Sequence, residues 1–349
     1  MLTRAFVLFF VFFTWSVASA QSTRPTTKKL IEFGWDEPTT AYMKRHIAEM
    51  EKRPFNGCVF HINYTMPDGT NSGRFMNECW GKRAFTDAEL AASLEELRST
   101  PLKRFTHNFL RFNVLPGDVD WFDDFAAVVN NARQSARIAR EGKAAGVLFD
   151  IEMYAHPLFD YRKQRDAKTK SFDEYAKQAR LRGREVMAAF QQGYPDLHVL
   201  LTFGHSLPLS QTSDGKPLAE VDYGLLAPFL DGMYDVAAGN AKIIDGFELS
   251  YSYKEAKQFD EARALVRGEP IRRVVGADPK QYDRYVSLGF GLWMDYDWRK
   301  YGWDTSDFTK NHFTPEQFRD SLTKALDTAD EYVWFTRKRR AGGARRARR

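Results

Sequence analysis

Cysteine is scarce in this sequence, whose 349 residues contain only Cys58 and Cys79. A fold held by a framework of disulfides is therefore excluded, because such frameworks need several cysteine pairs in a short chain. Cys58 lies inside the apolar run Gly57–Ile62, which is typical of a buried strand. One disulfide and two packed free thiols are about equally compatible with the sequence.

The motifs of several large enzyme classes are also missing. The sequence has no His-Glu-x-x-His and no histidine pair at metal spacing on its first strand, so a zinc or binuclear hydrolase lacks its ligands. It has no Gly-x-Ser-x-Gly turn and no phosphate-binding Walker loop. No Gly-x-Gly-x-x-Gly follows the first strand, as a dinucleotide-binding fold would require. We therefore expect no cofactor and no resident metal.

Long apolar runs are absent after the first twenty residues. Residues 1–20 contain Arg4, an apolar stretch from Ala5 to Val17, and the small residues Ala18-Ser19-Ala20. This order is typical of a signal peptide that is cleaved after Ala20. The stretch is shorter than the roughly 20 apolar residues of a membrane anchor. We expect an exported protein, secreted or periplasmic, without a membrane span.

The net charge of +5 comes from the ends of the chain. Removing the eight positive charges of residues 337–349 and that of Arg4 leaves −4 for residues 21–336. A mildly acidic body argues against a nucleic-acid-binding surface on the folded domain. The arginine-rich end is predicted to be a disordered tail. Binding of a surface polyanion and a frameshifted C-terminus are the alternatives for this segment.

Apolar runs of strand length alternate with longer segments of helical periodicity, which predicts parallel strands joined by crossover helices. Eight strands favour a single α/β domain over residues 21–336, a (β/α)8 or TIM barrel. The predicted strands are Leu30–Asp36, Gly57–Ile62, Arg104–Leu110, Gly146–Met153, His198–Gly204, Lys242–Leu249, Leu288–Asp295 and Glu331–Thr336. The predicted helices are Thr39–Arg53, Thr86–Ser99, Trp121–Gly142, Ser171–Gly193, Tyr223–Ala238, Ser252–Gly268 and Pro315–Ala329, with a short segment at Arg272–Val286.

Three helix starts carry capping signals. Thr86, Ser171 and Thr314 are each followed within three residues by acidic or amide side chains. The insertion Asn63–Phe85, rich in glycine, asparagine and aromatic residues, is long enough to predict a functional loop.

The fourth predicted strand ends in Asp150-Ile-Glu152, directly after an apolar run. Active sites of barrels lie at the carboxyl ends of the strands. Because side chains alternate along a strand, Asp150 and Glu152 point the same way. Two carboxylates in a confined site raise the pKa of one of them, which a general acid requires.

This pattern resembles the TIM-barrel glycoside hydrolases. The resemblance rests on carboxylates and tryptophans at strand ends, namely Asp150, Glu152, Glu248, Asp295, Trp35 and Trp293. It implies that Glu152 is the proton donor. In a chitinase-like pattern Asp150 would help the substrate's own N-acetyl group to act as the nucleophile, although the other acidic residues of that signature are absent. In a two-carboxylate pattern Asp295 or Glu248 would be the nucleophile or base, and the carboxyl separation would select retention or inversion.

Further residues at predicted strand ends are candidates for binding an oligosaccharide or polysaccharide: Trp35, Asp36, His61, Asn108, Tyr154, His205, Tyr251 and Trp293. Each has a structural alternative: Asp36 could cap the helix near Thr39, and the histidines and tryptophans could belong to the core. The predicted function is that of a secreted glycoside hydrolase. The alternative is a carbohydrate-binding barrel without catalysis. The sugar, the linkage and the oligomeric state are not specified by the sequence.

Overall fold

The computed structural model describes residues 28–34, 36–296, 304 and 306–336. The predicted signal peptide, the basic tail and Trp35 lie outside the described residues. In the described part of the chain, no helix combines the length and the apolar character needed to cross a membrane.

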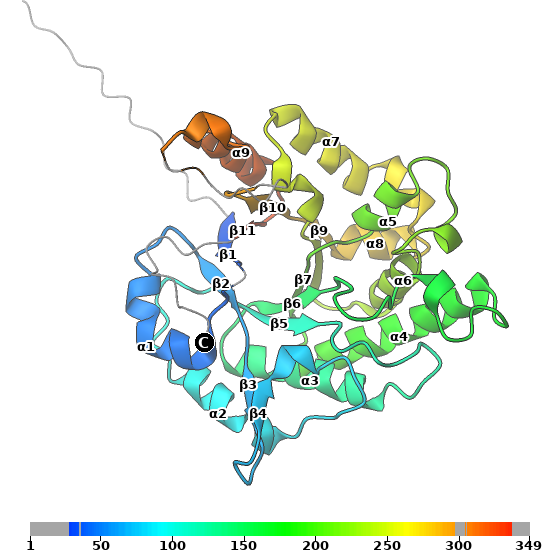
Figure 1. Ribbon diagram of the computed structural model, residues 1–349, viewed down its shortest axis with the longest axis horizontal. Helices are drawn as coiled ribbons and strands as arrows, with labels where there is room; N and C mark the ends of the chain where they lie inside the picture. The colour runs from blue at the N-terminus through cyan, green and yellow to red at the C-terminus, as the bar shows by residue number, and fades with distance from the viewer. Residues whose placement is uncertain (1–27, 35, 297–303, 305, 337–349) are drawn as a thin grey trace, which may run out of the picture.

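Nine parallel strands of the described chain form one sheet that curves into a nearly closed barrel (Figure 1). The strand order is β10-β11-β1-β2-β5-β6-β7-β8-β9. The sequence predicts eight strands, and the difference arises because the seventh is divided at Gly289. Its first part, β9, pairs with β8, and its second part, β10, pairs with β11. The two edges of the sheet therefore belong to one continuous segment of chain.

The barrel strands are β1 (Lys29–Glu32), β2 (Gly57–Phe60), β5 (Phe109–Asn113), β6 (Gly146–Asp150), β7 (His198–Leu201), β8 (Lys242–Asp245), β9 (Val286–Leu288), β10 (Phe290–Trp293) and β11 (Tyr332–Thr336). A separate antiparallel hairpin is formed by β3 (Asn63–Thr65) and β4 (Ser72–Arg74).

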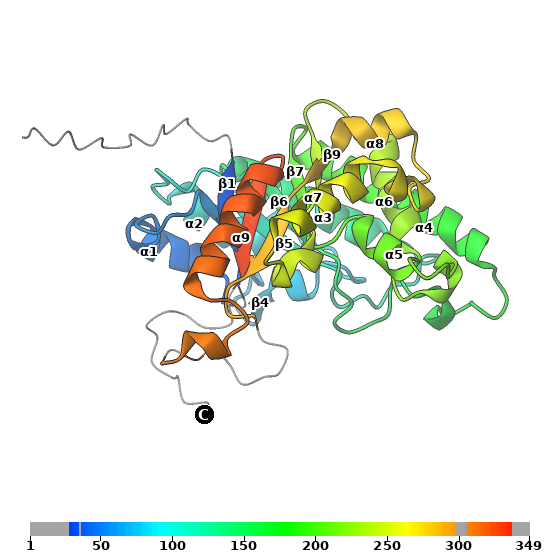
Figure 2. The ribbon, with the colours of Figure 1, turned by 90° about the horizontal axis from the view of Figure 1, so that it is seen from above.

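Helices surround the barrel on its outer side (Figures 1 and 2). They are α1 (Thr40–Met50), α2 (Asp87–Arg98), α3 (Ala126–Glu141), α4 (Phe172–Gly193), α5 (Ser206–Gln211), α6 (Leu226–Val236), α7 (Ala256–Arg267), α8 (Pro279–Tyr285) and α9 (Pro315–Thr328). The predicted caps Thr86, Ser171 and Thr314 are confirmed, and each belongs to a reciprocal capping box.

The third barrel strand begins later than predicted. Residues 103–105 form a loop because the Glu51 carboxylate accepts hydrogen bonds from their three backbone N–H groups. The strand therefore starts at Phe109 and ends at Asn113. Helix α5 and the hairpin β3–β4 are not predicted by the sequence, because both are short and arise within segments without clear periodicity.

Both cysteines are free and fully buried. The Cys58 thiol faces Asn108 Oδ1 at 3.7 Å, whereas the Cys79 thiol faces the carbonyl oxygen of Asn113 at 3.2 Å. Burial raises the pKa of Cys79 to about 12 and that of Cys58 well above its ordinary value. Of the two alternatives, the structure therefore shows packed free thiols rather than a disulfide.

An apolar layer fills the barrel interior and forms the floor of the carboxyl-end mouth. Each of its members comes from an inward-facing strand position, and together they are Ile31, Val59, Phe109, Leu148, Leu200, Ile244, Tyr332 and Trp334. Because strand side chains alternate with period two, the next inward positions toward the mouth are two residues further along each strand. Those positions include His61, Arg111, Asp150 and Thr202.

At the opposite end of the barrel, the Tyr332 hydroxyl lies between two histidines. It is 3.0 Å from His107 Nδ1 and 2.8 Å from His198 Nδ1. Burial lowers the pKa of both imidazoles, that of His198 to about 4. The folded state therefore favours neutral histidine.

This cluster predicts a loss of stability in mild acid. In the unfolded chain these histidines take up protons near pH 6.5, whereas in the folded state they resist protonation until lower pH. The free energy of unfolding should therefore fall as the pH decreases from about 6.5 toward 5, and urea denaturation at several pH values measures this. A Tyr332→Phe variant should lose about 0.5–1.5 kcal/mol at pH 7, because it removes the hydrogen bonds of this hydroxyl to two half-buried imidazoles. Stability that stays constant or rises between pH 7 and 5 would contradict this account.

Candidate active site

Arg111 lies at the centre of the polar groups in the mouth of the barrel. Its side chain is only 12% exposed and donates to Asp150 Oδ2 at 2.6 Å and to Glu37 Oε1 at 2.9 Å. A third bond runs from its Nε to Asn113 Oδ1 at 2.9 Å. Burial opposes the positive charge, but Asp150 and Glu37 more than offset this effect, so the pKa of Arg111 lies above its ordinary value.

Both oxygens of the Asp150 carboxylate are engaged by the protein. Besides the Arg111 contact, Oδ2 accepts the Tyr154 hydroxyl at 3.2 Å, and Oδ1 accepts the backbone N–H of Glu152 at 3.1 Å. Asp150 is fully buried as the last residue of β6. This set of donors fixes the position of the Asp150 carboxyl group, and the Arg111 contact adds a charge-assisted hydrogen bond.

Glu152 lies two residues beyond Asp150 and is half-buried. Its pKa is raised to about 7, first by burial and second by the negative charge of Asp150. The Tyr154 hydroxyl forms a short hydrogen bond to Glu152 Oε2 and opposes this shift in part. A carboxyl group that keeps its proton near neutral pH therefore stands at the mouth of the barrel.

Glu248 follows β8 and belongs to the same electrostatic cluster. Burial raises its pKa well above the ordinary value, and the charges of Glu152 and Asp150 raise it further. Its backbone N–H donates to the carbonyl oxygen of Thr202 at 3.2 Å. The preceding residue, Phe247, has a φ of +46°, a left-handed conformation that is costly for a large side chain and occurs often at functional sites.

Several buried polar atoms in the mouth have no hydrogen-bond partner among the described residues. They are Glu37 Oε2, both ring nitrogens of His61, Thr202 Oγ1 and Glu248 Oε2. Buried polar groups in folded proteins are nearly always paired. These atoms come from the ends of four different barrel strands, so the mouth is a place where an external polar molecule could supply the missing partners.

Two predicted binding residues lie elsewhere in the fold. Asn108 precedes β5 at the amino end of the barrel, where its amide bonds the Cys58 N–H and the Phe105 carbonyl oxygen. His205 is buried in the outer layer, where its Nε2 lies 3.1 Å from Asp231 Oδ1. Both predictions are wrong in position, because the third strand starts later than expected and the chain turns into α5 directly after His205.

The other predicted residues occupy different parts of the mouth region. Asp36 is exposed and does not cap α1, since the Thr39 side chain accepts the capping bond from the Tyr42 N–H. Asp295 accepts a hydrogen bond from the Trp293 indole at 2.7 Å. The Trp293 ring packs against Tyr251, with a centroid distance of 5.4 Å.

The insertion Asn63–Phe85, predicted to be a functional loop, contributes a buried tryptophan to the core. Trp80 from this insertion is fully buried, and its ring lies 5.5 Å from the Phe149 ring and 5.8 Å from the Phe229 ring. This matches the structural alternative for the tryptophans.

Sequence reasoning missed Arg111, Glu37 and Thr202 as members of the site. One signal was available for Arg111, a cation within the apolar strand Phe-Leu-Arg-Phe-Asn. A charged residue in a buried strand needs a buried counter-charge, which points to a polar cluster. In the described part of the chain, no group of three or more histidine, cysteine or acidic side chains is arranged to hold a metal ion.

The fold is similar at low sequence identity to solved barrel structures. The alignment with 3-keto-D-glucoside 4-epimerase from E. coli covers 90% of this chain and 94% of that protein, with 13% identity and a TM-score of 0.40. The alignment with morphinone reductase covers 88% of this chain and 81% of that protein, with 12% identity and a TM-score of 0.39. No family model and no curated protein matches the sequence.

Proposed function

We propose that the protein is a glycoside hydrolase in which the Glu152 carboxyl group protonates the departing glycosidic oxygen. The observation that carries this proposal is the half-buried position of Glu152 directly after β6, beside the Asp150 carboxylate, where burial and that charge raise its pKa to about 7. A general acid is most effective when its pKa lies near the working pH. Burial together with a second ionised carboxylate is a known physical route to such a pKa.

Glu248 is the better candidate for the second carboxylate. Its raised pKa depends in part on the charge of Glu152, so the two carboxyl groups interact electrostatically. Its Oε2 has no partner among the described residues, whereas Asp295 Oδ1 is held by the Trp293 indole. The Glu248 oxygen is thus not engaged by another described residue.

The contacts of Asp150 favour the two-carboxylate route over the substrate-assisted one. A residue that orients an N-acetyl group needs an oxygen available to the substrate. Both Asp150 oxygens already accept bonds, from Arg111 and Tyr154 on one side and from the Glu152 N–H on the other. Asp150 therefore serves as the fixed negative charge that keeps Glu152 protonated.

In the proposed reaction the proton of Glu152 passes to the glycosidic oxygen as the bond between that oxygen and the sugar carbon breaks. Ionised Glu248 either attacks that carbon or takes a proton from the attacking water, and the net change is the addition of one water molecule. The charge of Glu152 raises the pKa of Glu248, so ionisation of one carboxyl group disfavours ionisation of the other, and the proposed reaction starts from the form in which Glu152 holds the proton.

An exposed aromatic side chain next to Glu152 supports a carbohydrate substrate. Tyr154 is 55% exposed although its hydroxyl is anchored to Asp150 and Glu152. An aromatic face held in this way suits stacking against the C–H face of a sugar ring.

The pH dependence of activity tests the role of Glu152. A general acid must be protonated, so kcat/KM should fall as the pH rises through about 7, the pKa of Glu152. In Asp150→Asn the neighbouring negative charge is gone and the pKa of Glu152 decreases, so the alkaline limb should move to lower pH. Activity profiles of both proteins on one glycan substrate measure this shift. An alkaline limb that stays in place, or that moves upward, would contradict the assignment.

A further inference from the structure

Two buried side chains beside Arg111 carry hydrogen-bonding atoms that no described residue satisfies. Glu37 follows β1 and His61 follows β2, and their side chains are 3% and 4% exposed. Glu37 Oε1 accepts from Arg111, but it lies 3.7 Å from His61 Nδ1, which is too far for a hydrogen bond. Glu37 Oε2 and both His61 ring nitrogens have no partner among the described residues. They are therefore hydrogen-bonding atoms that a bound molecule can satisfy.

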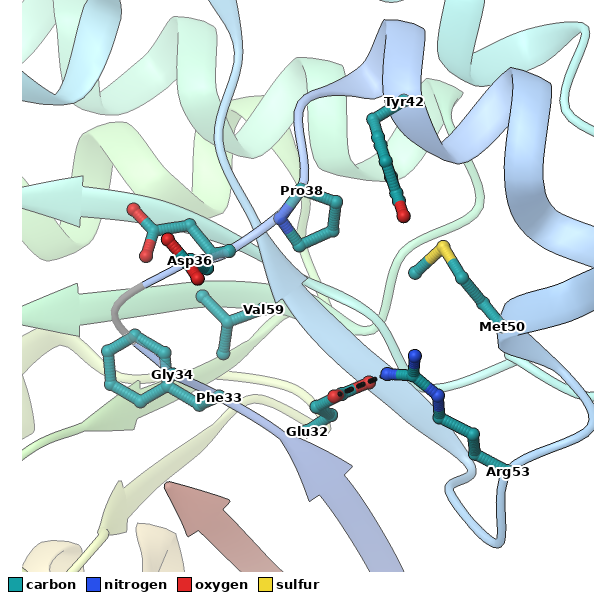
Figure 3. Close-up of a pocket in the computed structure, with 10 residues that line it drawn as sticks. Glu32, Phe33, Gly34, Asp36, Pro38, Tyr42, Met50, Arg53 and Val59 are labelled. Atoms are coloured by element: carbon teal, nitrogen blue, oxygen red, sulfur yellow. Dashed lines mark hydrogen bonds and ion pairs between the residues drawn. The ribbon is translucent and has the colours of Figure 1, made fainter. Parts of the chain in front are cut away.

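Glu37 also lines an open cavity at the carboxyl end of β1 (Figure 3). The cavity has a volume of about 70 Å³, and Phe33 and Val59 form part of its wall. Val59 of β2 precedes His61 by two residues. In Figure 3, Phe33 and Val59 lie beside Asp36, apart from the ion pair of Glu32 and Arg53. Glu37 thus lies in the wall of this cavity, and His61 is its neighbour.

The hydrogen-bonding and charge properties of Glu37 and His61 restrict which molecules can bind beside them. Burial, with the charges of Arg74 and Arg111, lowers the pKa of His61 to about 4, so its ring is neutral and offers one donor and one acceptor. Glu37 Oε2 is an acceptor only. Two adjacent hydroxyl groups, which both donate and accept, can satisfy this set. An anion would be repelled by Glu37 and Asp150, whose two negative charges outnumber the single positive charge of Arg111.

We propose that Glu37 and His61 form a subsite that binds two adjacent hydroxyl groups of a neutral sugar ring beside Arg111 and Asp150. This proposal rests on the proposed function, because it takes the bound sugar ring to be part of the hydrolase substrate. It deepens that function by selecting neutral sugars with a vicinal diol over anionic ones. It also explains why an imidazole with two unpaired nitrogens is retained in a buried position, where an apolar ring would cost less free energy.

The test is isothermal titration calorimetry of the full chain with D-glucose, D-mannose, D-galactose and D-xylose, and with D-glucuronate as the anionic probe. The variants are His61→Phe, which keeps a ring and removes both nitrogens, and Glu37→Gln, which can still accept from Arg111. The matched control is His46→Phe, an exposed position on α1. Each site variant should weaken binding of the preferred neutral sugar about tenfold, the effect of one or two lost hydrogen bonds. The control should leave the affinity unchanged.

A second readout separates binding from a structural role. Replacement of an unpaired buried imidazole by phenylalanine should leave the thermal midpoint unchanged or raise it, while the sugar affinity falls. Glu37→Gln provides the same binding test if His61→Phe does not fold. Unchanged affinity in both variants, glucuronate binding as tight as that of the neutral sugars, or no binding of any neutral sugar to the wild-type protein would each overturn the subsite.

The subsite and the proposed function fail in different ways. Sugar binding that depends on Glu37 and His61 in a protein that cleaves no glycan would support the subsite and overturn hydrolysis. Glycan cleavage that depends on Glu152, together with sugar affinities that are unchanged in the Glu37 and His61 variants, would support hydrolysis and overturn the subsite.

Discussion

Replacement of Glu152 by glutamine should decrease kcat on an unactivated glycan by about 100- to 10,000-fold, the range that general acid catalysis contributes. The amide has the shape of the carboxyl group but no proton to donate near pH 7. The matched control is Glu95→Gln, an exposed carboxylate on α2, which should retain wild-type kinetics. Steady-state kinetics on the glycan that the wild-type protein cleaves best provide the measurement.

Substrates with different leaving groups distinguish the roles of Glu152 and Glu248. A dinitrophenyl glycoside departs without protonation, so Glu152→Gln should recover most of its activity on that substrate. Glu248→Gln should remain impaired on both substrates, because its carboxylate acts on the sugar carbon or on water. Equal losses on both substrates for Glu152→Gln would contradict its assignment as the proton donor, and wild-type turnover in that variant would remove Glu152 from the mechanism.

Replacement of Arg111 by methionine should lower the free energy of unfolding by about 3–5 kcal/mol, the cost of breaking a buried ion pair by removing one partner. Methionine fills much of the same space but leaves the Asp150 and Glu37 carboxylates buried without a counter-charge. Urea denaturation at pH 7 measures the change. The control is Arg319→Met on α9, an exposed arginine paired with Asp320, where the loss should be below about 1 kcal/mol.

The partners of Arg111 allow a further check. Adding Glu37→Gln and Asp150→Asn to Arg111→Met should restore a large part of the lost stability, since no buried charge is then left unpaired. If Arg111→Met is as stable as Arg319→Met, Arg111 does not organise the mouth of the barrel as described.

The parts of the site that depend on local pattern were predictable from the sequence. Asp150 and Glu152 follow an apolar run, and the period of two along a strand places them on one face. In the structure β6 ends at Asp150 rather than at Met153, so Glu152 lies in the turn that follows, where its N–H bonds the Asp150 carboxylate and the charge of Asp150 raises its pKa. Helix caps such as Thr86 were predictable for the same reason, because a capping box involves only four consecutive residues.

The parts that depend on contacts between distant segments were not predictable. Arg111 enters the site only because β5 starts at Phe109 and pairs with β6 in the register that brings Asn113 opposite Asp150. The loop that delays this strand is held by Glu51, which lies more than fifty residues earlier. The predicted strand Arg104–Leu110 placed Asn108 near its carboxyl end. In the structure Asn108 precedes β5, and Asn113 is the residue at the carboxyl end.

A shift of one residue decides which side chain enters the mouth. Asp36 and Glu37 are neighbours of the same charge after β1, yet Asp36 is exposed and Glu37 is buried against Arg111. Similarly, His205 and Thr202 both follow β7, but His205 faces Asp231 in the outer layer. Composition does not distinguish these alternatives, because the chain direction after a strand is set by the packing of the following loop or helix.

The most direct test of the central claim is incubation of the purified protein with a panel of neutral polysaccharides and oligosaccharides, with assay of newly released reducing ends. The account predicts release of reducing ends from at least one neutral glycan by the wild-type protein, and none above background from Glu152→Gln. Saturable binding of a glycan without any release of reducing ends, together with unchanged affinity in Glu152→Gln, would contradict hydrolysis and identify a carbohydrate-binding barrel that lacks catalysis.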